Sequence, residues 1–160
     1  MVNAAEVRTG SKIGPRHPGI PRVPGVPVAP TVLSMLQSAR RGLAEATDET
    51  SPGARYVTAH LAALRAAAAV VAARGEPRPR RRKPHSVWEL LPQVEPALSE
   101  WAAFFAASAI KRAAAEAGLV RAVSTYEAEE LVRDATTFLN VAEHALGAES
   151  QPQLPLRPAS

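Results

Sequence analysis

The chain contains no cysteine, which excludes a disulfide framework, a thiolate metal site and a cysteine nucleophile. Aromatic residues are also scarce, at 4% of the sequence, although hydrophobic residues together make up 46%. Alanine supplies much of that apolar content. Because alanine favours helices and lacks the volume that strands need for packing, the composition predicts an all-α fold whose helices approach one another closely.

Long apolar runs are absent as well. The longest lies at 66–73, eight residues between Arg65 and Arg74, whereas a membrane span needs about 20. Residues 1–14 hold no apolar run of the kind that a secretory signal requires. Together with the lack of cysteine, these features predict a soluble, cytoplasmic protein with no membrane partner.

Basic residues are concentrated in segments outside the expected helices. The net charge is +4, yet residues 31–73 and 84–147 together hold eight basic and twelve acidic residues. The densest basic segment is a candidate for binding nucleic acid; it contains Arg78, Arg80, Arg81, Arg82 and Lys83. A mobile basic loop attracts phosphates or an acidic protein surface by charge, without sequence choice. The alternative is a solvated linker.

Proline marks both ends of the chain. In residues 1–30 it recurs every third position from Pro15 to Pro30, a spacing that favours extended polyproline II. We interpret this segment as a disordered arm that acts as a linker or as a ligand for an SH3-like groove. The predicted organisation is therefore a disordered arm at 1–30, a helical bundle at 31–147 with a basic loop at 75–85, and a disordered tail at 148–160.

Periodic apolar residues and capping signals predict four helices and one short helical turn. We expect helices at 32–46 (with Thr31 as N-cap), at 52–74, from 93 or 96 to 117, and from Ser124 to Gly147, with the short turn at 86–92. Capping boxes precede the turn, at Ser86–Glu89, and the last helix, at Ser124–Glu127. Four amphipathic helices with short links predict an antiparallel up-and-down bundle.

Two of these helices differ from a simple amphipathic pattern. The helix at 52–74 is apolar on two faces, so it is covered on two sides, either by neighbouring helices or by a second subunit. The helix that ends near 117 holds most of the large side chains, including Trp101, Phe104 and Phe105. We expect it to form the centre of the core, and we expect Trp88 to pack as a lid on the bundle.

Four segments, in this order and spacing, resemble an actinobacterial family of HEPN-domain proteins (higher eukaryotes and prokaryotes nucleotide-binding). They are RYVTAHLAALRAA at 55–67, SVWELLP at 86–92, EWAAFF at 100–105 and RDATTFL at 133–139. The resemblance implies a bundle of four to five helices, often dimeric, of unassigned role. Across the wider superfamily, members are metal-independent RNases, RNA-binding modules, or inactive partners of nucleotidyltransferases and of toxin–antitoxin systems.

The RNase signature of that superfamily is an arginine, four to six residues, and then a histidine. In such chemistry the histidine moves protons and the arginine stabilises charge on the phosphate. Arg55 and His60 have this spacing, but on one helix their side chains point about 140° apart. Arg78 and Arg80 have it with His85, inside the basic loop. The alternative for His60 is a structural histidine bonded to Tyr56 or to a backbone carbonyl.

Active members carry this motif near the last helix of the domain. There the present sequence offers Arg133 and His144, which are eleven residues apart and too distant for the signature. The acidic residues after Ser124 are explained by the helix dipole, and no metal or cofactor motif is present.

The leading hypothesis is therefore a non-catalytic helical module that binds nucleic acid or a protein, as a homodimer. The alternatives are a metal-independent RNase that uses Arg55 and His60, and an adaptor in a nucleotidyltransferase or toxin–antitoxin pair.

Overall fold

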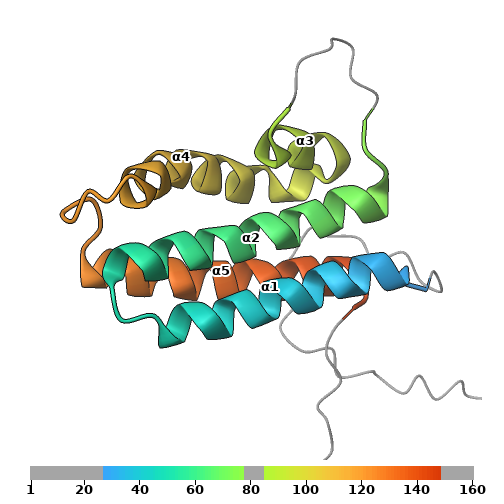
Figure 1. The fold of residues 1–160 in the computed structure, drawn as a ribbon. Helices are drawn as coiled ribbons and strands as arrows, with labels where there is room; N and C mark the ends of the chain where they lie inside the picture. Colours follow the sequence, from blue (N-terminus) through green and yellow to red (C-terminus); the bar gives the residue numbers. More distant parts are fainter. Residues whose placement is uncertain (1–26, 78–84, 149–160) are drawn as a thin grey trace, which may run out of the picture.

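The computed structural model describes residues 27–77 and 85–148, and all regular structure in these ranges is helical (Figure 1). The helices are α1 (Pro30–Asp48), α2 (Pro52–Arg74), α3 (Val87–Val94), α4 (Ser99–Glu116) and α5 (Thr125–Leu146), with a short 3-10 turn, η1 (Pro96–Leu98), between α3 and α4. The all-α prediction is confirmed. The predicted disordered arm up to residue 26, the tail from residue 149 and the basic segment 78–84 lie outside the described residues.

Helices α2, α3 and α5 begin at the capping residues that the sequence contains. Ser86 and Glu89 form a complete capping box at the start of α3, and Ser124 and Glu127 form another at the start of α5. The Ser51 side chain accepts the backbone N–H of Ala54 at the start of α2. Each cap satisfies backbone donors that a helix start leaves free, which is why these boundaries were predictable.

The start of α1 differs from the expectation. Thr31 is not the N-cap, because the helix already begins at Pro30 and Ala29 occupies the cap position without a side-chain hydrogen bond. Proline fits the first helical position since its φ is preset and its missing N–H would have no partner there.

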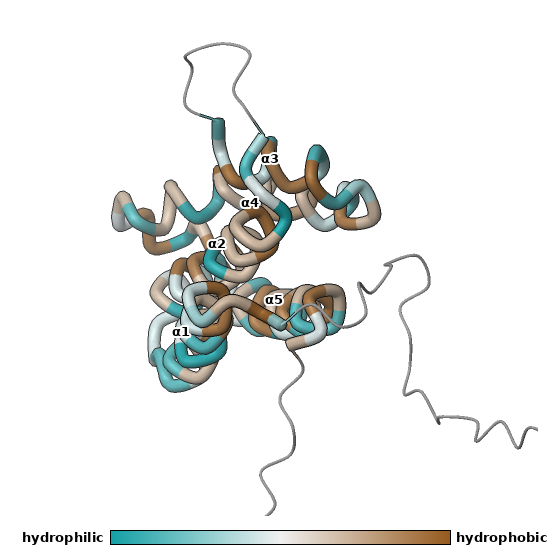
Figure 2. Tube along the Cα trace, turned by 90° about the vertical axis from the view of Figure 1, so that its right-hand side faces the viewer, coloured by the Kyte–Doolittle hydropathy of each residue, from teal (hydrophilic) through white to brown (hydrophobic). Residues whose placement is uncertain are grey.

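The helices form layers around α2. Figure 2 shows α3 and α4 on one side of α2, and α1 and α5 on the other side. Every other helix packs against α2, and α1 also packs against α5. Helix α2 is thus the centre of the bundle, and the expectation that the helix ending near residue 117 would be central is wrong.

Alanine explains why α2 takes the central position. Ten of its residues are buried, six of them alanine, whereas α4 buries only Ala102 and Phe105. Small side chains let neighbouring helices come close on several sides. At the crossing with α1, a Cβ added to Gly42 would lie 3.2 Å from the Cβ of Ala62. The face with Ala63, Ala67 and Val70 is therefore covered within one chain, whereas Val57, Leu61 and Ala68 on the neighbouring face remain partly exposed.

The large side chains form one aromatic cluster over α2. Phe105 of α4 is stacked between the rings of Trp88 and Trp101, with centroid distances of 5.1 and 6.0 Å. Phe138 of α5 lies 5.2 Å from the same phenylalanine ring. Trp88 is buried and belongs to the core, as expected for a lid on the bundle.

Helix α2 is, among the described helices, the one long and apolar enough to cross a membrane by length and composition alone. Ten of its residues are buried inside the bundle, against the other helices. Its composition is therefore that of a core helix.

Candidate functional site

His60 lies at the interface of α2 and α4 and is completely buried. Its Nε2 is 3.0 Å from the carbonyl oxygen of Phe105, and its Nδ1 is 3.4 Å from Nη1 of Arg112. Because the carbonyl and the guanidinium can only accept and donate respectively, Nε2 carries the proton and Nδ1 accepts. The rings of Trp88 and Phe105 meet the imidazole edge-on.

These surroundings favour the neutral imidazole. Burial lowers the pKa of His60 below 6.5, and the positive charge of Arg112 lowers it further, against the opposing effects of the Phe105 carbonyl and Glu116. Both ring nitrogens are engaged inside the core. A substrate phosphate or hydroxyl therefore has no route to this ring in the described structure.

Arg55 makes its contacts on a different side of α2. Its Nη2 donates to the carbonyl oxygen of Glu49 at 2.7 Å, and its Nη1 lies 3.8 Å from Glu129 of α5. His60 instead contacts α4. The structure thus directs the two residues of the predicted pair toward different helices, as their helical spacing indicated.

The other predicted pairs join His85 to arginines outside the described residues. Arg78, Arg80, Arg81, Arg82 and Lys83 lie outside them. His85 contacts the Glu89 carboxylate at 3.2 Å. Arg133 is exposed and 3.8 Å from Glu130 on the same helix.

Most basic side chains on the described surface are matched by carboxylates. Arg40 pairs with Glu143, Arg74 with Glu95, Lys111 with Glu127 and Arg112 with Glu116. Within residues 27–77 and 85–148 no group of three or more His, Asp or Glu side chains could hold a metal ion. This part of the chain thus presents neither a metal centre nor a continuous cationic surface.

The outer face of α4 has a different character. From Ala103 to Ala117, the face opposite Phe105 and Arg112 exposes only apolar side chains, and Ile110 at its centre is 78% exposed. Leu119 and Val120, in the turn that follows, are 61% and 94% exposed. An apolar groove runs between this face and the turn, lined by Ala107, Ile110, Ala114, Leu119 and Val120 among others.

Residues 46–143 match the profile of the SAV_6107-like HEPN family, from the end of α1 into α5. The match covers more than half of the chain and includes α2, α3, α4 and most of α5. The chain belongs to this HEPN family. It matches neither a curated protein nor a solved structure.

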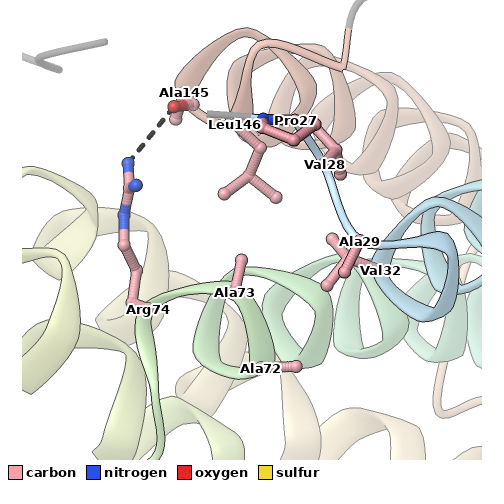
Figure 3. A pocket seen from close by; sticks show the side chains of 9 residues that line it. All are labelled: Pro27, Val28, Ala29, Val32, Ala72, Ala73, Arg74, Ala145 and Leu146. Atoms are coloured by element: carbon pink, nitrogen blue, oxygen red, sulfur yellow. Dashed lines mark hydrogen bonds between the residues drawn. The ribbon is translucent and has the colours of Figure 1, made fainter. Parts of the chain in front are cut away.

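The HEPN domain has a second hollow where α1 begins and α2 and α5 end (Figure 3). Small and branched apolar side chains line it, among them Val32, Ala73 and Leu146. Arg74 lies at its rim, where Nη2 donates to the carbonyl oxygen of Ala145 at 3.2 Å and Nε donates to Glu95 at 3.3 Å. The guanidinium of Arg74 is therefore used to hold α2 against the end of α5 and against Glu95.

The outer face of α4 is the surface that the sequence analysis missed. Its signal was present: the residues from Ala103 to Ala117 that lie opposite Phe105 are all alanine except Ile110. Since the same helix also carries the aromatic stripe, it is apolar on two opposite faces. The role of Arg112 beside His60 carried no local signal, because the two residues are 52 positions apart.

Proposed function

We propose that this HEPN domain is a non-catalytic module that binds a protein partner. The observation that carries the proposal is the exposed apolar face of α4, with Ile110, Leu119 and Val120 open to solvent. A helix that is apolar on opposite faces belongs in a buried position, and a contiguous exposed apolar patch marks an interaction surface. The partner is therefore a protein with a complementary apolar surface.

The position of His60 supports a module without RNase chemistry. Proton transfer requires the imidazole within hydrogen-bond reach of the RNA 2′-hydroxyl or of the leaving oxygen. Here the ring is buried and both nitrogens are occupied by Phe105 and Arg112. Arg55, which would stabilise the phosphate, is engaged with Glu49 and Glu129 instead. The metal-independent RNase remains the alternative function.

The charge distribution favours a protein over nucleic acid as the partner. Phosphate binding needs unpaired cations gathered on one surface, whereas Arg40, Arg74 and Lys111 are each held by a carboxylate. If residues 78–83 do bind RNA, the affinity falls steeply with salt and is lost when these cations are neutralised. An adaptor in a nucleotidyltransferase or toxin–antitoxin pair is one form of the proposed role. We also propose a cytoplasmic location, which the absence of cysteine favours.

Affinity purification from the native host tests the proposal. The tagged full-length chain is compared with Ile110→Glu and with Leu33→Glu, a matched change at an exposed leucine of α1 that is 37% exposed. We expect wild type and Leu33→Glu to retain one protein in stoichiometric amount, either an untagged copy of this chain or another protein, and Ile110→Glu to lose it. Identical recovery by all three chains would contradict a partner surface on α4.

A further inference from the structure

We infer that the cleft between α4 and α5 binds an arginine side chain of the protein partner. This inference rests on the proposed protein-binding role and names the chemical group that the partner presents beside α4. Lys111 lines both the apolar groove on the outer face of α4 and the cleft. A protein seated on that face therefore lies next to the mouth of the cleft.

The cleft forms because α4 and α5 each pack against α2 while their backbones stay apart from one another. Its walls include Tyr56 of α2, Phe104 of α4 and Asp134 of α5. The hydrogen bond from Lys111 to Glu127 bridges the two helices. The volume is about 160 Å³, whereas sites for nucleotides and other small molecules measure about 300–1,000 Å³. The cleft therefore has room for a single side chain.

Tyr56 provides the first unfilled polar position in the cleft. The residue is only 6% exposed, and its hydroxyl makes no hydrogen bond within the part of the chain that the structure describes. A buried tyrosine hydroxyl normally has a partner. Because the side chain lines the cleft and is otherwise enclosed by the bundle, a ligand in the cleft can supply that partner.

Asp134 provides the second unfilled position. It is partly buried, and it makes neither an ion pair nor a hydrogen bond with any residue of the two described ranges. It lies well past the first turn of α5, so the helix dipole does not account for it. Burial, and then the nearby charge of Glu130, raise the pKa of Asp134. The carboxylate therefore lacks the donor that its surroundings require.

The polar atoms of the cleft are mostly hydrogen-bond acceptors. Besides Asp134, they include the carboxylate of Glu130 and the hydroxyl of Ser108, which has donated its proton to the carbonyl oxygen of Phe104 at 2.9 Å. Lys111, the cation among the lining residues, already donates to Glu127. A ligand that completes this arrangement supplies positive charge and several N–H donors, whereas a phosphate would be repelled.

Arginine matches these requirements better than lysine does. Its guanidinium is planar and carries five N–H donors, so it can donate two parallel bonds to Asp134 and a further one to the oxygen of Tyr56. Phe104, which is 41% exposed, offers an aromatic face on which the guanidinium plane can stack. The ammonium group of lysine has three donors and no plane to stack.

NMR of the aromatic side chains in the full-length chain tests the site, with N-acetyl-arginine amide as the probe at constant ionic strength. We expect saturable shifts of the Tyr56 and Phe104 signals with a dissociation constant of about 1–10 mM, because one side chain makes few contacts. N-acetyl-citrulline amide, which has the same shape but a neutral urea group, should give no saturable shift.

Variants assign the binding to the cleft, with circular dichroism to verify folding. Asp134→Asn should weaken binding of the arginine probe about tenfold, because a charge-assisted bond is lost. Asp48→Asn, at an exposed carboxylate of α1, is the matched change and should leave it unaltered. Tyr56→Phe keeps the buried ring and should weaken binding about threefold. Equal shifts with both probes, or no saturation up to about 50 mM, would overturn the site.

Purification from the native host then tests the source of the arginine. Asp48→Asn should retain the protein that Ile110→Glu loses, and Asp134→Asn should recover several-fold less of it. Full recovery by Asp134→Asn, alongside binding of the probe, would overturn the assignment to the partner. If Ile110→Glu loses no protein, the proposed function fails and the partner assignment fails with it, while the probe titration still decides whether the cleft binds a guanidinium.

Discussion

Nε2 of His60 lies 3.0 Å from the carbonyl oxygen of Phe105, so the histidine with the spacing of an RNase residue joins α2 to α4. Arg112 approaches the other ring nitrogen and requires it to accept a hydrogen bond. The proton on Nε2 of His60 is therefore held in a hydrogen bond that helps to join the two helices.

This contact makes stability depend on pH. The pKa of His60 is lowered in the folded chain, so below about pH 6.5 the unfolded chain binds more protons and stability falls as the pH falls. Urea unfolding of wild type at several pH values between about 8 and 5 should show this loss. His60→Gln, which cannot titrate, should be less stable at neutral pH but should show a smaller loss on acidification. Parallel profiles for both chains would contradict the assignment of His60 as a buried neutral group.

The aromatic stack should contribute most to the stability of the α4 contact. Phe105→Ala removes a completely buried ring from between Trp88 and Trp101. We expect a loss of about 3–5 kcal/mol in the free energy of unfolding, measured by urea denaturation. Phe104→Ala is the matched control, because Phe104 is 41% exposed and should cost far less. Equal losses would mean that the stack does not hold α4.

At the start of α5, we expect the carboxyl group of Glu127 to have an unusually low pKa. Lys111, through a hydrogen bond, and then the backbone N–H of Ser124 lower the pKa of Glu127 from 4.5 to about 2. Its contribution to stability is therefore present above pH 4.5 and is lost as the pH falls toward 2. A carboxyl NMR titration should locate this value, and Lys111→Met should raise it while leaving it below 4.5. An ordinary pKa for Glu127 in wild type would contradict the geometry of this cap.

Local signals account for the parts of the fold that the sequence predicted. Ser86 and Ser124 bond to backbone groups three residues away, so their motifs identify the helix starts without tertiary information. The centre of the bundle was not predictable in the same way. Side-chain size pointed to α4, but the small side chains of α2 allow helices to pack on two opposite sides. Which helix becomes central depends on how the helices assemble.

In the candidate site, too, local spacing was predictable from the sequence and long-range contacts were not. The divergence of Arg55 and His60 followed from helical spacing alone, and a backbone carbonyl was one of the two partners considered for His60. That the carbonyl belongs to Phe105, and that Arg112 caps the other nitrogen, depends on contacts 45 and 52 residues apart. The apolar outer face of α4 was visible in the sequence, but its exposure depends on which helices cover which faces.

RNA cleavage distinguishes a HEPN domain without RNase chemistry from a metal-independent RNase. End-labelled structured RNA is incubated in EDTA with wild type and with Arg55→Ala/His60→Ala, and the products are resolved on a denaturing gel. We expect intact RNA with both chains. Cleavage by wild type that the double variant loses would contradict this expectation and would make Arg55 and His60 catalytic residues.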